Sequence, residues 1–432
     1  MAARDASPGT ACPCVLYTAR MAVNDNEVAV VGGGAAGIAA ARYLHDAGIQ
    51  CLLIEARERL GGRAWTVNDP SGAAFDLGCG WLHSADRNPW AGIAVAQGRT
   101  VDKTLPPWAR KSPRRNFSES EEREFHRALD SFSERVHAKS GAPDRAAAEF
   151  LEPDNRWNGL IGAIYSYISG APLEQISVRD LANYADSNVN WRIAQGYGTT
   201  IAAHAAGVPV AMGCPVLAID HTGKRVRIET AKGTFTVDRV IVTLPTSLIA
   251  AEAVKFTPAL PEKTEAARGL PLGLDDKLFL SLSQPEEFAP ETRVFGRTDR
   301  SKTGTYSLRM FGRPYIEAYF GGELARELED GGEAAFFDFA VEELTGQFGS
   351  SFAKRVAALA LHRWGRDPFA RGSYSYALPG RADDRAQIAA SVDNRLFFAG
   401  EACSTHDYST AHGAYFTGVA AAEAALATLR NK

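Results

Sequence analysis

A glycine-rich turn between two short apolar strands constrains this chain more than any other feature. Residues 27–55 read EVAVVGGGAAGIAAARYLHDAGIQCLLIE, which predicts a strand, a turn, a helix and a second strand ending at Glu55. The glycines of a G-x-G-x-x-G turn have no Cβ atoms, so a pyrophosphate can approach the backbone N–H groups at the helix N-terminus. A carboxylate at the end of the second strand can accept hydrogen bonds from a ribose diol. We therefore predict a dinucleotide-binding βαβ unit, in which Gly32, Gly34, Ala36 and Gly37 are expected to contact the cofactor.

Two further segments favour a flavin dinucleotide over a nicotinamide one. Residues 56–66 (ARERLGGRAWT) place two glycines and Arg63 just after the second strand, where an extended FAD needs another contacting loop. Residues 395–401 (RLFFAGE) predict a strand that runs into Gly400 and Glu401, and 413–430 predict a helix. The N-terminus of that helix can face the flavin. One more βα unit of the sheet is the alternative reading of these C-terminal residues.

Composition and charge narrow the class of protein. The chain has 432 residues, which suits two domains, and its 45% apolar and 23% charged residues are ordinary for a globular protein. A net charge of −4 and a pI near 6.2 give no reason to expect nucleic acid or an anionic membrane as partner. The sequence has no apolar run long enough for a transmembrane helix.

The cysteines and the N-terminus bear on location. The six cysteines are scattered and no Cys/His set completes a zinc site, so we expect no metal and a reducing, cytoplasmic location. Residues 1–21 lack the apolar core of a signal peptide, and we expect a disordered extension there. A homodimer is left open as the assembly.

The pattern along the chain predicts interleaved domains. Helical segments are expected at 118–137, 158–184 and 323–360, and strands at 208–245, 274–283 and 305–320. The fold class is therefore α/β, with a Rossmann-type FAD-binding domain of the glutathione-reductase-like kind and a mixed sheet-plus-helix (α+β) substrate domain. We assign 22–95, 196–262 and 363–432 to the FAD-binding domain, and 96–195 and 263–362 to the substrate-binding domain.

Taken together, four motifs resemble the flavin-containing amine oxidases, a family that includes monoamine oxidases, polyamine oxidases and lysine-specific histone demethylases. The motifs are GGGAAGIAAA with GGR at 61–63, FDLGCGWLH at 75–83, RWGRDPFARGSYSY at 363–376 and FAGEACSTHDYSTAHGAYFTG at 398–418. The last two look more like polyamine oxidases than monoamine oxidases. Residues 100–190 match only loosely, so they say little about the substrate.

The resemblance implies which residues hold FAD. Glu55, Arg57 and Arg63 would contact the adenosine ribose and the phosphates, and the backbone of Val216 would meet adenine. Trp364 would pack near the flavin ring, although a core tryptophan is the alternative. The other expected cofactor contacts are Gly62, Gly78, Cys79, Gly80, Trp81, Gly400, Glu401, Thr410 and Ala411.

The resemblance also implies a reaction centre. In DDKLFLSLS (275–283) the leucines share one face by period two, and Lys277 lies on the other. Such a lysine is commonly a solvated edge residue, but the family places one where a water links it to the flavin. Lys277 and Tyr374 are therefore the expected catalytic residues, and the substrate contacts are His83, Tyr374 and Thr410. Ser373 stands where monoamine oxidases carry a flavin-linking cysteine, which implies noncovalent FAD.

The expected function is FAD-dependent oxidation of a primary or secondary amine, polyamine-like or monoamine-like. The imine would be hydrolysed to an aldehyde and an amine or ammonia, and O2 would be reduced to H2O2. An L-amino-acid oxidase or another flavin dehydrogenase is the alternative. Such an oxidase needs an arginine in the loop at residues 80–83 to bind the substrate carboxylate, but these residues read GWLH and contain none. A histone demethylase would need a long inserted arm. A non-catalytic FAD-binding redox partner is the alternative from another class.

Overall fold

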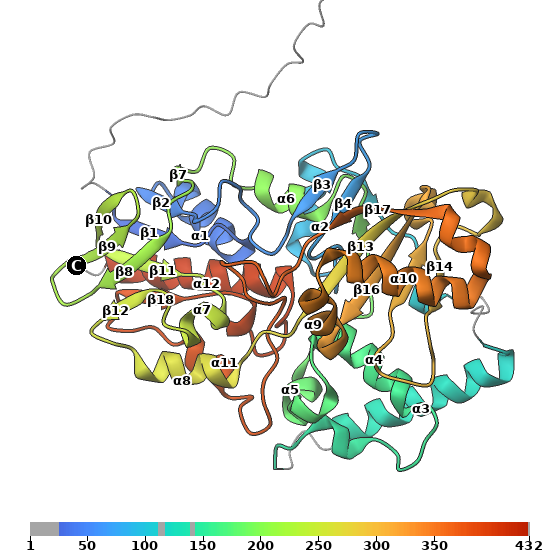
Figure 1. The fold of residues 1–432 in the computed structure, drawn as a ribbon. Coiled ribbons are helices and arrows are strands. Elements are labelled where there is room, and N and C mark those ends of the chain that lie inside the picture. The colour runs from blue at the N-terminus through green and yellow to red at the C-terminus, as the bar shows by residue number, and fades with distance from the viewer. Residues whose placement is uncertain (1–25, 111–116, 139–142, 431–432) are drawn as a thin grey trace, which may run out of the picture.

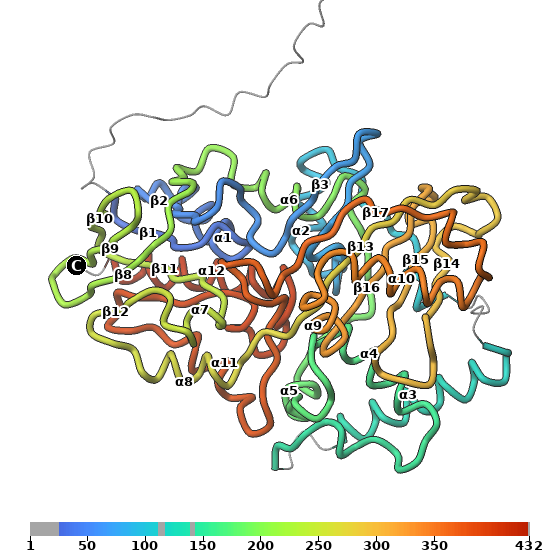
Figure 2. Tube along the Cα trace, in the orientation of Figure 1, coloured from blue at the N-terminus to red at the C-terminus, as the bar shows by residue number. Residues whose placement is uncertain are grey.

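The computed structural model describes residues 26–110, 117–138 and 143–430, and the extension expected at 1–21 lies outside them. Figure 1 shows two lobes side by side, one around β1 and α12 and the other around β13 and β16. Figure 2 shows that the chain passes between the lobes several times, so that neither is built from one continuous segment. The α/β fold class with interleaved segments is therefore confirmed.

The first lobe is built on a parallel five-stranded sheet, ordered β18-β11-β1-β2-β7. Its apolar strands are buried on both faces, as parallel sheets require. The strand bounds are β1 Val28–Val31, β2 Cys51–Ile54, β7 Val210–Ala211, β11 Arg239–Val242 and β18 Leu396–Phe398.

Two helices cover one face of this sheet, α1 (Ala35–Asp46) and α12 (Ala411–Arg430). Small residues let them approach closely, because a Cβ on Gly418 would lie 2.2 Å from the Ala36 carbonyl oxygen. Helices α2 (Pro89–Ala96) and α6 (Tyr197–Ala203) extend the same core. The first and the last helix of the described chain, α1 and α12, thus pack side by side (Figure 2).

The opposite face carries a second sheet, ordered β10-β9-β8-β12, and three short helices. Alternate residues of β9 are buried, as expected for a sheet with one solvated face. The strands are β8 Val216–Asp220, β9 Val226–Thr230, β10 Gly233–Val237 and β12 Lys255–Thr257. The helices are α7 Thr246–Ala250, α8 Pro261–Gly269 and α11 Asp384–Ala389.

The second lobe has an antiparallel sheet, ordered β14-β15-β16-β13-β17. Helices α9 (Gly322–Gly331) and α10 (Glu333–Phe348) pack on one face of it. The strands are β13 Asp275–Leu282, β14 Thr292–Phe295, β15 Thr305–Leu308, β16 Tyr315–Gly321 and β17 Val356–Leu361. Two small antiparallel sheets lie outside the main sheets: the hairpin of β3 Thr66–Asn68 with β4 Ala74–Asp76, and the long-range pair of β5 Val101–Asp102 with β6 Arg192–Ile193.

Helices α3 (Glu119–Ala138), α4 (Asn158–Ser169) and α5 (Val178–Asn183) pack beside the antiparallel sheet of the second lobe, in a core of their own. The helical prediction for 158–184 was wrong at Gly170, whose φ of 67° ends α4 in a left-handed cap. The helical prediction for 323–360 was wrong from residue 356, where VAALAL forms β17. That segment pairs antiparallel with β13, and a long-range pairing of this kind overrides local propensity.

Candidate active site

A cavity of about 1210 Å³ is lined by residues of both lobes. Gly37 is the exception among the residues expected to contact cofactor or substrate: its missing Cβ would lie 1.8 Å from the Gly32 carbonyl oxygen, so it permits a tight turn instead. All the others line the cavity: Gly32, Gly34, Ala36, Glu55, Arg57, Gly62, Arg63, Gly78, Cys79, Gly80, Trp81, His83, Val216, Lys277, Trp364, Tyr374, Gly400, Glu401, Thr410 and Ala411.

The glycine turn leaves the N-terminus of α1 free to bind a phosphate. No side chain caps α1, so its first N–H groups keep their donor capacity. A Cβ on Gly34 would have only the Gly62 Cα within 4 Å, at 3.9 Å, and one on Gly400 would have nothing within 4 Å. Open space at two glycines beside free backbone donors fits a dinucleotide phosphate chain.

Glu55 supports this turn and faces the cavity from the end of β2. Its Oε2 accepts a hydrogen bond of 2.6 Å from the Gly33 N–H, and its Oε1 accepts one of 2.8 Å from the Arg57 N–H. Each carboxylate oxygen has a second lone pair, so both can still accept from a ribose diol. Arg57 in turn pairs with Asp367, and this contact, together with His362, lowers the pKa of Asp367 to about 2 against the opposing effect of burial.

Arg63 and Glu401 form a second charged group on the cavity wall. Arg63 Nη1 donates to Glu401 Oε1 at 2.9 Å and to the Ser373 carbonyl oxygen at 2.6 Å. Glu401 Oε2 accepts from the Ser375 hydroxyl at 2.6 Å. Burial alone would raise the pKa of Glu401, but the charge of Arg63 and the Ser375 hydrogen bond lower it. Glu401 is therefore an anion that can accept from a bound polyol chain.

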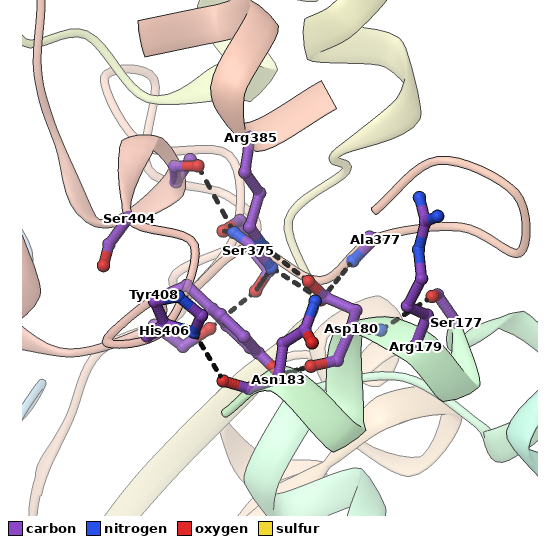
Figure 3. Close-up of polar contacts among 12 residues, drawn as sticks. Ser177, Arg179, Asp180, Asn183, Ser375, Ala377, Arg385, Ser404, His406 and Tyr408 are labelled. Atoms are coloured by element: carbon purple, nitrogen blue, oxygen red, sulfur yellow. Dashed lines mark hydrogen bonds and ion pairs between the residues drawn. The ribbon is translucent and has the colours of Figure 1, made fainter. Parts of the chain in front are cut away.

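The ion pair of Arg385 with Asp180 lies outside the cavity and is linked to Glu401 through Ser375 (Figure 3). The Arg385 guanidinium donates to both carboxylate oxygens of Asp180, at 2.6 and 2.8 Å, and its Nη1 donates to the Ser375 hydroxyl at 2.9 Å. The ring of Tyr408 lies 3.7 Å from the guanidinium carbon, and its hydroxyl donates to the Asp180 carbonyl oxygen at 2.7 Å. A hydrogen-bonded chain therefore runs from α5 in the second lobe to Glu401 in the first.

Lys277 lies in the middle of a sheet, because β13 runs between β16 and β17. The lysine is 5% exposed, which contradicts the solvated-edge alternative. Its Nζ donates to the Asp76 carbonyl oxygen at 3.2 Å and lies 3.6 Å from Glu317 Oε1. A Cβ on Gly80 would lie 3.2 Å from this Nζ, so the loop glycine leaves the ammonium room. Lys277 is thus a buried cation that faces the cavity.

Aromatic side chains surround the same part of the cavity. Tyr374 donates its hydroxyl proton to the Tyr167 carbonyl oxygen and lies 3.2 Å from the Tyr319 hydroxyl oxygen. Trp364 is anchored by a hydrogen bond of 2.9 Å from its Nε1 to the Leu77 carbonyl oxygen. Trp81 packs edge-on against Trp108. The tyrosines offer ring faces and hydroxyl dipoles that suit an amine.

The remaining expected substrate contacts are polar. Thr410 caps α12, since its hydroxyl accepts from the Gly413 N–H at 3.0 Å and donates to the Asp407 carbonyl oxygen at 2.6 Å. His83 Nδ1 lies 2.6 Å from Asn190 Oδ1, and burial lowers the pKa of the imidazole. His83 is therefore neutral near pH 7. Burial likewise raises the pKa of the Cys79 thiol to about 12, which leaves it protonated.

Several cavity or supporting residues were missed at the level of sequence, among them Asp180, Arg385, Tyr319 and Asp275. The first two meet across more than 200 residues of chain and show no local spacing signal. Asp275 does carry a signal, because it stands two residues before Lys277 in β13 and so shares its face. That period-two relation could have identified it.

Known proteins resemble this chain over most of its length. A family model described as flavin-containing amine oxidoreductase matches residues 35–97 and 99–426. Polyamine oxidase 2 of Arabidopsis thaliana is 29% identical over 448 residues, which cover 95% of this chain and 90% of that protein. Lysine-specific histone demethylase 2 of Homo sapiens is 26% identical, over 92% of this chain and 53% of that protein.

A solved structure shows the same fold. A double mutant of putrescine oxidase, from a redesign of cofactor binding, superposes with a TM-score of 0.75 and 18% identity over 93% of this chain and 99% of the other. The fold and the cavity define a flavoprotein oxidoreductase. The chain belongs to the family of flavin-containing amine oxidoreductases, which confirms the resemblance inferred from the motifs.

The family and the relatives establish the broad activity, and the protein is an FAD-dependent amine oxidase. The residues described above fit FAD, because free helix N–H groups, open glycines and two anionic side chains line an elongated cavity. Within the described ranges, no helix has the length and apolarity to span a membrane. The same ranges contain no group of three metal-ligating side chains.

Proposed function

We propose that the protein oxidises the carbon–nitrogen bond of a primary or secondary amine bound between Lys277 and Tyr374. The observation that carries this is a buried ammonium group of Lys277 facing the same cavity as a tyrosine pair. When bound, FAD supplies the two-electron oxidation that leaves an imine for hydrolysis and yields H2O2 on reoxidation by O2.

The side chains of this protein would bind and orient the reactants. Glu55, Arg57 and Arg63 hold the ribose and phosphates, and Glu401 accepts from the polyol chain. Tyr374 presents its ring to the amine and fixes the reacting carbon, while Thr410 borders the opposite side of the site. Lys277 orders a water at the flavin end of the cavity, held by Asp76 and Glu317 behind it.

The expectation of noncovalent FAD also stands as a proposal. The Ser373 hydroxyl donates to the Asp275 carbonyl oxygen at 2.7 Å and accepts from the Asp275 N–H at 2.8 Å. This side chain is occupied in joining two segments of the cavity wall, and a hydroxyl forms no thioether. Ser373 thus has a structural role at the position of the linking cysteine.

The finer substrate class and the location are proposals as well. The similarity to polyamine oxidases and to putrescine oxidase favours a polyamine-like or monoamine-like substrate, with O2 as acceptor and no nucleic acid as partner. Cys51, Cys79, Cys214 and Cys403 are free thiols, which supports a cytoplasmic location. A homodimer is kept as the proposed assembly, and mass measurement in solution tests it.

An amine panel read by peroxide release tests the proposed reaction. It should include primary monoamines, diamines, polyamines and L-amino acids under one O2 concentration. Peroxide with amines and not with amino acids is the expected result. Turnover of amino acids alone would favour an L-amino-acid oxidase, and FAD binding with no turnover of any amine would favour a non-catalytic redox partner.

A further inference from the structure

Asp275 occupies a position in the cavity that no role described so far explains. It opens β13 and pairs with Gly321 of β16, where the absence of a side chain leaves it room. By the period of two, Asp275 and Lys277 project from the same face, beside Tyr319 of the neighbouring strand. All three side chains line the cavity.

The carboxylate of Asp275 is buried without a partner. The residue is 4% exposed, and among the described residues neither Oδ1 nor Oδ2 has a hydrogen-bond partner. Leaving a buried polar group unpaired costs stability, and for a charge the cost is larger. Because the protein tolerates this cost at its cavity, we expect the Asp275 carboxylate to have a function there.

Burial raises the pKa of Asp275 more than its two favourable neighbours, Tyr374 and Lys277, lower it. The Lys277 ammonium is engaged by Asp76 and Glu317. The hydroxyl of Tyr374 lies close enough to lower the pKa of Asp275, but its proton goes to the Tyr167 carbonyl oxygen. Burial dominates and raises the pKa of Asp275 well above its ordinary value. A cation brought in from outside would restore its charge.

Resting on the proposed function, we infer that Asp275 binds a second, non-reacting ammonium group of the substrate. The carboxylate and the surrounding tyrosine rings form a site for an alkylammonium, since aromatic faces and an anion both attract a cation. The substrate is therefore a diamine or polyamine rather than a simple monoamine. Asp275 takes no part in the redox step and acts as a specificity-determining residue.

The spacing along β13 agrees with this assignment. Residues two apart on a strand are separated by about 7 Å. With the reacting carbon beside Lys277, a second nitrogen at Asp275 would be one such repeat away. A trimethylene or tetramethylene spacer between two nitrogens spans a comparable distance, whereas a long-chain monoamine would bring apolar carbon against the carboxylate.

Matched amines test the inference. The pairs are putrescine with n-butylamine, cadaverine with n-pentylamine, and spermidine with N-propyl-n-butylamine; each pair has the same carbon chain but differs in the number of amino groups. Anaerobic stopped-flow reduction of the holoenzyme gives an apparent Kd for each. Asp275→Asn should raise the Kd of the multiply charged amine by about 10- to 100-fold and change that of the monoamine by less than about 3-fold.

Controls separate a local role from a general electrostatic one. Asp130→Asn removes one carboxylate charge from the exposed cavity wall in α3 and should leave the preference for diamines unchanged. Since the Asp275 carboxylate is unpaired, Asp275→Asn should keep FAD content and should not lower Tm. Equal effects of Asp275→Asn on both members of every pair, or no effect on either, would overturn the inference.

A binding measurement keeps this inference distinct from the proposed reaction. If no amine reduces the wild-type flavin, the proposed function fails, but diamine binding can still be read by thermal shift. Putrescine and spermidine should then raise the Tm of the wild type and not that of Asp275→Asn. The absence of any difference between these two proteins would reject the Asp275 site by itself.

Discussion

Arg385 and Asp180 form a bidentate ion pair whose side chains are 1% and 2% exposed. Arg385 comes from α11 in the first lobe and Asp180 from α5 in the second. Arg385 also donates to the Ser375 hydroxyl, which in turn donates to Glu401. The pair therefore joins the two lobes behind the cavity rather than at the surface.

Removing one partner of this pair should destabilise the protein strongly. Asp180→Asn leaves the Arg385 guanidinium buried without its counter-charge, and we expect a loss of about 3–5 kcal/mol in the free energy of unfolding. Chemical denaturation measures it. Arg385→Met combined with Asp180→Leu should be less destabilising than either single change. Additive losses would mean that the two residues act independently.

Glu55→Ala should weaken FAD retention. The variant loses the acceptor for the ribose and the two hydrogen bonds that support the glycine turn, so the Kd for FAD should rise by about 10- to 150-fold. Dialysis followed by flavin absorbance measures this. Glu58→Ala, which removes an exposed carboxylate from the same segment, is the matched control. Full FAD occupancy in Glu55→Ala would exclude Glu55 as a ribose ligand.

Lys277→Met should retain FAD and slow turnover by roughly 10²-fold, because the flavin end of the cavity loses the group proposed to order a water. Stopped-flow kinetics separates flavin reduction from reoxidation by O2. Lys302→Met, at an exposed lysine paired with Glu327, controls for the loss of a positive charge. Unchanged rates in both half-reactions would leave Lys277 a purely structural cation.

FAD should be released from the protein by acid. Ser373 cannot form the thioether and is engaged by the backbone of Asp275, so denaturation should free the flavin. Precipitation with trichloroacetic acid and centrifugation should give a yellow supernatant. A yellow pellet would reveal a covalent link elsewhere in the chain.

Stability should fall with acid below pH 6.5 through His412. Burial lowers the pKa of this imidazole to about 4, aided by His83 and Arg87 and opposed by Asp407 at 3.3 Å. The unfolded chain takes up the proton first, so the contribution of His412 is complete above pH 6.5 and is lost as the pH falls to about 4. The loss is about 3 kcal/mol.

The measurement is the free energy of unfolding between pH 8 and 4. His412→Gln should flatten this profile, because a side chain that does not titrate has no linked proton. The control variant is His126→Gln, which replaces a partly buried histidine of α3 whose ring nitrogen lies 3.9 Å from Glu122. This variant should keep the wild-type slope. A profile that is the same in all three proteins would assign the acid sensitivity to other groups.

The dinucleotide-binding unit could be predicted from local sequence patterns, because its strand, glycine turn, helix and second strand all lie within residues 27–55. The resemblance placed Lys277 and Tyr374 on the cavity, and the structure adds where their polar atoms point. Strand β17 escaped prediction since its only distinguishing feature is its pairing with β13. Asp180 escaped for the same reason, as its partner Arg385 is far away in the sequence.

The order of the parallel sheet has a consequence for synthesis. Strand β18 and helix α12 complete the same core that β1 and α1 begin, and Arg63 meets Glu401 only when both are present. Until residues 396–430 leave the ribosome, one edge of β11 lacks its partner β18, and α1 lacks the helix that packs beside it. We therefore expect FAD to bind only after this segment has been synthesised, and we expect a chain truncated before residue 396 to be degraded rather than to form a smaller flavoprotein.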